Sequence, residues 1–288
     1  MDVISGIAEL RAALAARRRA GGGHRIGFVP TMGSLHAGHL SLVDAARARS
    51  DTVVMSIFVN PLQFGPTEDF AAYPRDPAGD YAKVESRGVD LVFAPTVDTL
   101  YPTAIGWPVR VVPRIETARW EAAVRPGHFD GVLTVVAKLF NIVQPDLAFF
   151  GQKDVQQVSL VRSMVRELDI PIELVVVPTV REPDGLAMSS RNAYLDESQR
   201  GSALALSRAL NAVAQAWTNG TRESAELERR GREVLGEAPE VKVDYFAVVE
   251  PGRLEPAARA EPGSVVIVAA RVGPTRLIDN IVLGGLGD

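Results

Sequence analysis

Two histidines separated by two residues stand near the start of the chain, within the stretch 30–39. The apolar run 26–29 predicts a buried strand before this stretch, and a run with helical spacing follows it. The backbone N–H groups and the dipole at the start of a helix favour bound anions. Because His36 and His39 fall on one face of the first turn, their imidazoles would lie where a phosphate chain binds and donate to its oxygens.

The residues alone leave three interpretations of this stretch open. In the first, the histidines contact phosphate, and Gly38 lets a nucleotide approach the backbone closely. In the second, they only cap and pack the helix, since a motif this short constrains function loosely. A zinc pair is the weakest interpretation, because the chain has no cysteine and its other histidines, His24 and His128, lie far away in sequence.

Polar residues also follow later apolar runs. Gln63 lies in the turn 60–64, after a strand predicted over residues 52–59, and its amide offers one acceptor and two donors. Ligands of open α/β sheets gather at the carboxyl ends of the strands. We therefore expect this turn and the histidine turn to line one crevice, although spacing alone favours an exposed loop glutamine.

Lys153 follows the strand predicted over residues 146–150, at the expected start of a helix. A lysine there is a compact cation for a phosphate, and Gln157, one turn on, would face the same way. An exposed surface position is the alternative for both side chains. The loop 188–191 carries two hydroxyls and a guanidinium that can wrap a triphosphate, and an ordinary polar linker is the alternative there.

Three further polar residues receive structural interpretations. Asp80 lies in a helix predicted to start at Pro77, and we expect it to be solvated rather than close to a metal. Arg125 and His128 precede the strongly apolar helix predicted over residues 132–143. For both of them a structural role is favoured over a catalytic one.

Four separated segments of the chain occur in a recognisable order: 31–33 before the histidines, 58–64, 151–157 and 188–192. Together they resemble the pantoate–β-alanine ligases, a family of the H-x-G-H nucleotidyltransferase superfamily. The resemblance extends from Arg25 to Asn280, nearly the full length. It departs from the common family pattern at Gln152, where that pattern has glutamate, and it keeps the Gly-x-Lys-Asp core.

The resemblance implies an ATP-dependent ligase of pantothenate and coenzyme A biosynthesis. Such an enzyme condenses (R)-pantoate with β-alanine to pantothenate, AMP and diphosphate through a pantoyl adenylate. Mg²⁺ is expected on the ATP phosphates, ligated mostly by phosphate and water, and no metal site made of side chains is expected. The alternatives are another H-x-G-H adenylyltransferase, which would need cations near Gln63 and Gln157 for a phosphate acceptor, and a non-catalytic nucleotide-binding module.

The resemblance also assigns roles to residues of this chain. The residues expected to act in catalysis are His39, the favoured proton donor, and His36, Lys153, Ser189, Ser190 and Arg191. The residues expected to bind ATP are Met32, Gly33, Ser34, Leu35, His36, Ala37, Gly38, His39, Gly151, Gln152, Lys153, Asp154, Val180, Met188, Ser189, Ser190 and Arg191. The substrates, pantoate above all, are expected to contact Gln63 and Gln157. The side chain that holds the β-alanine carboxylate stays open.

Composition narrows the class of protein. The chain has 288 residues and a net charge of −4, and its longest basic run is the trio 17–19, which argues against a nucleic-acid surface. No stretch has the length of a membrane span, and the N-terminus lacks the apolar region and the cleavage pattern of a secretory signal. With no cysteine, a cytoplasmic enzyme is expected, and the apolar helix 132–143 makes a homodimer reasonable.

The pattern of apolar runs predicts an α/β fold, with a Rossmann-like doubly wound parallel sheet and a smaller C-terminal α+β domain. Residues 1–178 are expected to bind ATP and pantoate, and residues 179–288 to act as a lid. The other helices are predicted over 2–19, 196–217 and 221–236. The other strands are predicted over 89–95, 109–112, 172–177, 241–249, 264–270 and 275–283.

Overall fold

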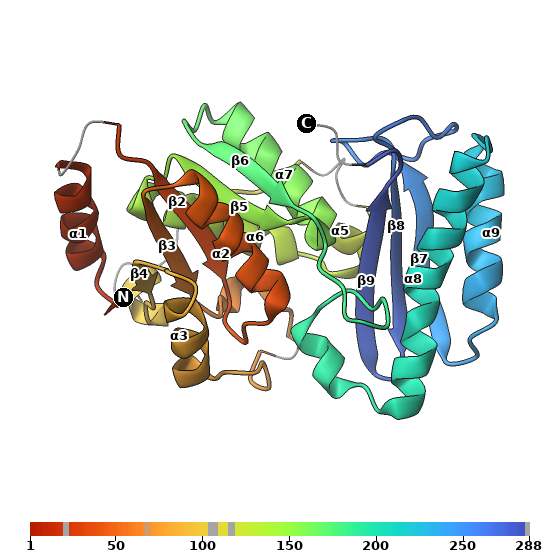
Figure 1. The fold of residues 1–288 in the computed structure, drawn as a ribbon, viewed down its shortest axis with the longest axis horizontal. Coiled ribbons are helices and arrows are strands. Elements are labelled where there is room, and N and C mark those ends of the chain that lie inside the picture. Colours follow the sequence, from red (N-terminus) through yellow and green to blue (C-terminus); the bar gives the residue numbers. More distant parts are fainter. Residues whose placement is uncertain (20–22, 67, 69, 103–108, 115–118, 286–288) are drawn as a thin grey trace. The chain divides into compact units, whose positions relative to one another are not determined.

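A computed structural model of the chain describes residues 1–19, 23–66, 68, 70–102, 109–114 and 119–285 (Figure 1). The chain separates into two compact units. The first consists of Met1–Gly151 and Leu160–Val177, and the second of Gln152–Ser159 and Pro178–Asp288. The short segment Gln152–Ser159 therefore groups with the second unit. The predicted roles of the two parts, ATP and pantoate binding and lid closure, stay predictions.

A parallel sheet forms the centre of the first unit. Its six described strands lie in the order β1-β4-β3-β2-β5-β6. Their bounds are β1 (Asp2–Ile4), β2 (Ile26–Thr31), β3 (Thr52–Ile57), β4 (Leu91–Phe93), β5 (Leu147–Gly151) and β6 (Glu173–Val177). The apolar runs predicted as covered strands occupy the middle of this sheet, because a parallel sheet is buried on both faces. The predicted doubly wound α/β fold is confirmed.

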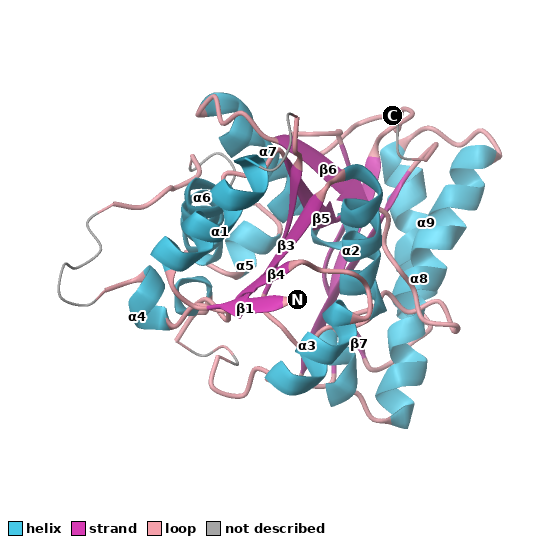
Figure 2. Ribbon diagram, turned by 60° about the vertical axis from the view of Figure 1, so that its left-hand side comes forward, coloured by secondary structure: helices cyan, strands magenta, loops and turns pink. Residues whose placement is uncertain are grey.

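Helices cover both faces of this sheet, as Figure 2 shows. Their bounds are α1 (Ile7–Arg19), α2 (Ala37–Arg49), α3 (Pro77–Glu85), α4 (Val97–Leu100), α5 (Glu121–Val124), α6 (His128–Val143) and α7 (Val155–Glu167). On one face, α2 and α3 share a buried apolar cluster with the strands. On the other face, the Phe140 ring of α6 meets the rings of Phe28 and Phe150 edge-on, with centroids 6.4 Å apart in each pair. Among the described residues, none of the helices is long and apolar enough to span a bilayer.

Two local predictions for this unit are wrong. Residues 2–4 form β1, which pairs with β4, so the first helix begins at Ile7 and not at residue 2. The predicted strand 109–112 is absent from the described residues, where Val109 and Val112 are 80% and 60% exposed. The Val111 N–H donates to Thr134 Oγ1 of α6, at 3.1 Å, instead of to a neighbouring strand.

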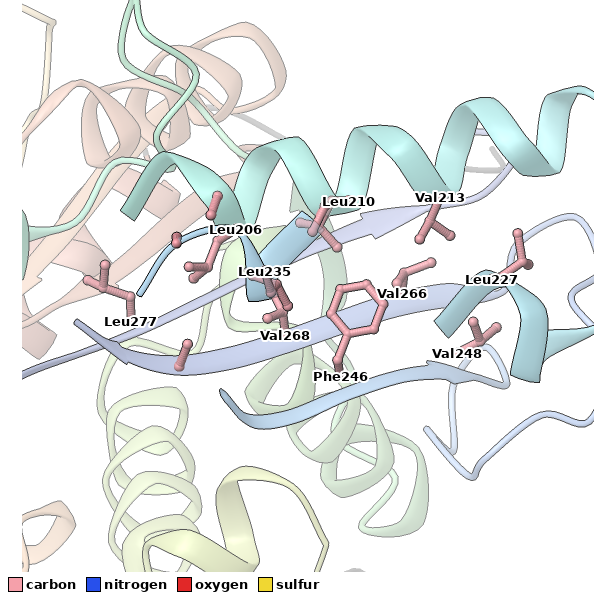
Figure 3. Packing of buried hydrophobic residues seen from close by; sticks show 14 of the residues in the cluster. Leu206, Leu210, Val213, Leu227, Leu235, Phe246, Val248, Val266, Val268 and Leu277 are labelled. Atoms are coloured by element: carbon pink, nitrogen blue, oxygen red, sulfur yellow. The ribbon is translucent and has the colours of Figure 1, made fainter. Parts of the chain in front are cut away.

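An antiparallel sheet and two long helices form most of the second unit. The bounds are α8 (Glu197–Thr218), α9 (Ser224–Gly236), β7 (Val241–Val249), β8 (Val265–Val272) and β9 (Thr275–Val282), and β9 is an edge strand in the order β7-β8-β9. Figure 3 shows leucine and valine side chains of α8 directed at apolar side chains of the sheet. Asp196 and Gln199 form a capping box that starts α8. The predicted smaller α+β part is confirmed.

Gly131 allows helix α6 to touch the turn that carries Gln63. A Cβ atom added to Gly131 would lie 2.3 Å from the Leu62 carbonyl oxygen and 2.5 Å from the Gln63 backbone nitrogen. Because both contacts are with backbone, a side-chain rotation cannot relieve them. We expect Gly131→Ala to lower the free energy of unfolding in urea by about 2 kcal/mol, as overpacking in a filled interior does.

Gly201 supplies the matched control for this substitution. It lies in α8, is exposed, and a Cβ there would meet nothing within 4 Å. Since alanine favours a helix over glycine by up to about 1 kcal/mol, Gly201→Ala should leave stability unchanged or raise it. Equal unfolding midpoints for the two variants would contradict the close approach at Gly131.

Candidate active site

The turn after β2 is built by side chains that bond its backbone. Thr31 Oγ1 donates to the Ser56 carbonyl oxygen at 2.7 Å and accepts from the Gly33 N–H at 3.3 Å. Gly33 and Ser34 adopt left-handed conformations, with φ of 82° and 52°. This reversal carries the chain from the end of the strand to the start of α2, as predicted from the strand, glycine and helix pattern.

Asp80 anchors this turn from helix α3. Its carboxylate accepts from the Ser34 and Leu35 N–H groups, at 2.8 Å each, and is 1% exposed. Lys83 adds its ammonium, which donates to the Leu35 carbonyl oxygen at 3.0 Å and lies 3.6 Å from Asp80 Oδ1. The predicted solvated position for Asp80 is wrong, because the inward face of α3 delivers it to a turn about 45 residues away.

The two histidines cap helix α2 with each other. His36 is the N-cap residue, and its Nδ1 accepts from the Gly38 N–H at 3.2 Å. His39 Nδ1 accepts from the His36 N–H at 3.4 Å, and the two ring centroids lie 4.1 Å apart. Acceptance at Nδ1 assigns the ring proton of each histidine to Nε2. Capping therefore orients two N–H donors, so the capping and the phosphate interpretations are compatible.

The structure gives the zinc interpretation no support. Across the part of the chain that is described, no group of three or more histidine, aspartate or glutamate side chains is arranged to hold a metal ion. The Nδ1 atoms of the histidine pair accept from backbone N–H groups. A structural zinc site normally needs four ligands in a tetrahedral arrangement.

Gln63 is a buried residue with a fixed amide, and not the exposed loop glutamine that its spacing favoured. It lies in the single turn η1 (Pro61–Gln63) after β3 and is 8% exposed. Asn60 Nδ2 donates to Gln63 Oε1 at 3.1 Å, and Gln63 Nε2 lies 3.1 Å from Met32 Sδ. Tyr101 donates its hydroxyl to Asn60 Oδ1 at 3.0 Å. The predicted proximity of the turns after β2 and β3 is thus confirmed by the Met32 contact.

Arg125 and His128 support the same turn from the start of α6. Arg125 binds both carboxylate oxygens of Glu68, at 2.7 Å each, and lies 2.9 Å from His128 Nε2. His128 Nδ1 lies 2.8 Å from the Gln63 carbonyl oxygen. Burial, and then the charge of Arg125, lower the pKa of His128 to about 4. His128 is therefore neutral at pH 7 and donates from Nδ1, in agreement with the structural role predicted for it.

This cluster predicts a loss of stability in mild acid. The pKa of His128 is about 4 in the folded chain and 6.5 by its ordinary value, so the unfolded chain binds the additional proton between these two values. The contribution of His128 to the free energy of unfolding is therefore complete above pH 6.5 and is lost as the pH falls toward 4. The upper limit of this loss is about 3 kcal/mol. We expect His128→Asn, which keeps a donor for the Gln63 carbonyl, to flatten the unfolding free energy measured by urea titration between pH 6.5 and pH 4. An unchanged slope in the variant would contradict the burial of a neutral imidazole.

In the second unit, Asn280 of β9 holds the turn that carries Lys153. Gln152–Asp154 form a single 3-10 turn, and α7 begins at Val155, two residues later than predicted. Asn280 Nδ2 donates to the carbonyl oxygens of Gln152 and Lys153, at 3.0 and 2.9 Å, and Asn280 Oδ1 accepts from Gln152 Nε2 at 3.1 Å. The Lys153 ammonium makes no hydrogen bond or ion pair with another described residue. Sequence reasoning missed Asn280, because no local signal links positions 128 residues apart.

The loop that carries the predicted serines and arginine is folded, and is not a simple linker. A short hairpin pairs Arg181 with Ala187, and the Met188 N–H donates to the Val180 carbonyl oxygen at 3.0 Å. Ser189 then caps the 3-10 helix η5 (Ser190–Tyr194), with its Oγ accepting from the Arg191 N–H at 3.3 Å. Because Ser189 Oγ is the acceptor in this bond, its hydroxyl proton is not used in it.

The profile of the family described as Pantoate-beta-alanine ligase matches residues 2–282. The chain belongs to the pantoate-beta-alanine ligase family. It is 49% identical over 288 residues to the pantothenate synthetase of Koribacter versatilis, covering 100% of this chain and 98% of that protein. The crystal structure of pantothenate synthetase from Thermus thermophilus is 52% identical, with a TM-score of 0.92 and coverage of 98% and 99%. The pantoate-beta-alanine ligase from Francisella tularensis, complexed with beta-gamma ATP and beta-alanine, is 32% identical, with a TM-score of 0.79 and coverage of 98% and 97%.

For this member of the pantoate-beta-alanine ligase family, each unit gathers a different set of the predicted residues. The first unit brings the stretch from Met32 to His39 together with Gln63. The second places Lys153 and the loop from Val180 to Arg191 in the unit that contains β9. Gln157 is half-buried in the first turn of α7. Sequence reasoning missed the supporting roles of four residues. Asp80, Asn60 and Asn280 bond predicted site residues, and Tyr101 bonds Asn60.

Proposed function

We propose that the chain joins pantoate to β-alanine at the expense of ATP, through a pantoyl adenylate. The pantoate carboxylate attacks the α-phosphorus of ATP, and diphosphate leaves. The amine of β-alanine then attacks the acyl carbon, which releases AMP and gives pantothenate. Family membership supports the overall reaction. The structure of the Francisella relative, complexed with beta-gamma ATP and beta-alanine, supports the binding of ATP and of β-alanine.

The observation that carries this proposal is the histidine pair at the start of α2. Both rings are oriented by hydrogen bonds at Nδ1, so their Nε2–H groups are fixed before ATP arrives. Donors that are already oriented stabilise the charge on a pentacoordinate phosphorus without a cost of reorganisation. In this proposal His36 and His39 donate to phosphoryl oxygens, with His39 as the proton donor.

The other predicted residues neutralise phosphate charge and bind pantoate and adenosine in this proposal. Lys153, Ser189, Ser190 and Arg191 neutralise the transferring and leaving groups, since two hydroxyls, an ammonium and a guanidinium match phosphate oxygens. Gln63 and Gln157 orient the hydroxyls and the carboxylate of pantoate. The adenosine is held by the backbone near Met32, Gly33, Gly151 and Val180. Alignment of the reactants contributes about 7 kcal/mol or more, and a single oriented donor about 3 kcal/mol.

Mg²⁺ is expected to accompany ATP, where it neutralises phosphate charge when bound. The carboxylate nearest to the histidine turn, Asp80, already accepts from two backbone N–H groups. The described side chains therefore do not fit a dedicated protein cage for this ion. Ligation by phosphate and water oxygens fits them better, which is a common arrangement for Mg²⁺.

A homodimer and a cytoplasmic location also stay predictions. The apolar residues of α6 are buried within a single chain, so their composition no longer requires a subunit contact. The exposed side chains of Val109, Val112 and Val124 are the better candidates for an apolar contact. Sedimentation equilibrium of the purified protein would give its mass in solution and decide between a monomer and a dimer.

The experiment that tests the proposed function measures diphosphate release from ATP under three conditions. Pantoate alone, β-alanine alone, and both substrates together are each added to the enzyme with ATP and Mg²⁺. We expect release of one equivalent with pantoate alone, no release with β-alanine alone, and turnover to pantothenate with both. Release that requires both substrates would exclude a separate adenylation step, and no release in any condition would favour a nucleotide-binding module.

A further inference from the structure

Two neighbouring residues of strand β9 hold the two phosphate-binding segments that the proposed function assigns to the second unit. Asn280, which is 2% exposed, makes three hydrogen bonds to Gln152 and Lys153. Asp279, which is 4% exposed, binds both terminal nitrogens of Arg181, at 2.6 and 3.0 Å. Consecutive side chains of a strand point to opposite faces, so two adjacent residues can bond two separate segments.

The bonds of Asn280 fix backbone and not only side chains. Its Nδ2 group uses both N–H donors on consecutive carbonyl oxygens, those of Gln152 and Lys153. The path of the backbone at Lys153 is therefore set, while its ammonium contacts no other described residue through a hydrogen bond or ion pair. This is the arrangement needed by a cation that must meet a phosphate at a defined point.

The bonds of Asp279 fix the base of the other segment. Arg181 opens the hairpin that ends at Ala187, and its guanidinium also donates to the Gly185 carbonyl oxygen at 3.1 Å. The serines and Arg191 follow directly after this hairpin. Asp279 Oδ1 further accepts from the Asn280 N–H at 2.8 Å, so the two anchors are bonded to each other.

We propose that Asp279 and Asn280 are positioning residues for adenylate formation, which place the Lys153 turn and the Ser189–Arg191 loop relative to each other. Neither residue acts on the substrate itself. The proposal rests on the proposed function of Lys153 and of the loop. It predicts that substitution of either residue slows the chemical step more than it weakens ATP binding, because a misplaced group near the phosphorus costs about 100-fold.

Isosteric substitutions provide the test. Asn280→Asp keeps an acceptor for Gln152 Nε2 but turns an oxygen toward two carbonyl oxygens, and Asp279→Asn removes the charge opposite Arg181. We expect the single-turnover rate of pantoyl adenylate formation, at saturating ATP and pantoate, to fall about 100-fold in Asn280→Asp and about 10-fold in Asp279→Asn. The Kd for ATP should change less than about 3-fold. Asn280→Ala, which adds no charge, serves if Asn280→Asp does not fold.

Asp244→Asn is the matched control. Asp244 of β7 pairs with Arg276 of β9 at 2.6 Å, in the same sheet, and has no hydrogen bond to either segment among the described residues. Its substitution should leave the adenylation rate unchanged at a comparable loss of thermal stability. An equal loss of rate in Asp244→Asn and Asp279→Asn would overturn the positioning role.

A double substitution separates positioning from general damage. If Asn280 acts through Lys153, then Asn280→Asp should slow the Lys153→Ala enzyme by less than about 3-fold. The same loss in both backgrounds, or a wild-type rate for Asn280→Asp, would overturn the inference. A wild-type rate for Lys153→Ala alone would instead contradict the proposed role of Lys153, so the two failures are distinguishable.

Discussion

Lys153→Ala is expected to lower the rate of pantoyl adenylate formation by about 100- to 1000-fold, which is the usual loss for one charge-stabilising donor at a reacting centre. The Lys153 ammonium makes no hydrogen bond or ion pair with another described residue, so its removal breaks no such contact among these residues. The loss should therefore appear in the single-turnover rate at saturating ATP, with an unfolding midpoint that stays at the wild-type value. Rapid quenching of enzyme mixed with ATP and pantoate measures the rate.

Lys242→Ala is the control for this substitution, because Lys242 is an exposed lysine of β7 in the same unit. It should retain the wild-type rate and stability. Lys153→Arg adds a second comparison, because it keeps the charge but replaces the compact ammonium with a planar guanidinium. We expect it to recover only part of the adenylation rate lost in Lys153→Ala. Wild-type adenylation by Lys153→Ala would remove this residue from the mechanism.

The fold followed from the sequence wherever a local pattern determined the element. Strands β2 and β3 contain the apolar runs predicted as buried strands, and helix α3 begins with an Asp and a Pro, as predicted. The failures occurred at short segments. Val109 and Val112 resemble a strand by residue type, yet they are exposed and have no strand partner in the described residues. Neighbouring strands, and not residue type alone, decide whether such a run joins a sheet.

The residues of the candidate site also fall into those that local sequence predicts and those that only tertiary contacts reveal. The sequence predicts the histidine pair, Lys153 and the Met188–Arg191 loop as site residues because each carries chemistry after a predicted strand, and these roles stay predictions. Asn60 and Gln63 lie in one short turn, but only tertiary contact with Met32 and Tyr101 shows that the amide is buried and oriented. A side chain buried by residues far away in sequence leaves no periodic signal.

The residues that hold the site were missed for this reason. Asp80 reads as an ordinary helix aspartate until the turn that it bonds is folded against α3. Asn280 reads as a polar residue in an edge strand, and its three partners lie at two positions about 130 residues earlier. In both cases buried backbone groups require a partner, and the fold supplies it from a distant element. The expected consequence of removing such a partner is a loss of both stability and activity.

Asp80→Asn tests directly what happens when buried backbone groups lose such a partner. The wild-type carboxylate accepts from two backbone N–H groups, and an amide of the same shape can accept only one of them. Its NH₂ group then faces a second donor in a buried place, and Lys83 loses its anionic neighbour. We expect the free energy of unfolding to fall by about 2 kcal/mol, as for a buried group left without a partner.

The activity of Asp80→Asn should fall further than its stability implies. The bonded turn leads directly into His36 and His39, so a displaced turn moves both imidazoles, and adenylate formation should slow by about 100-fold even well below the unfolding midpoint. Asp76→Asn is the matched control, since Asp76 caps the same helix through the Gly79 N–H and asparagine caps helices equally well. Urea unfolding measures the stability of both variants, and single-turnover kinetics measures their rates of adenylate formation. If Asp80→Asn were as active as Asp76→Asn, the histidine pair would be held by its own capping bonds alone, and the turn would contribute only to folding.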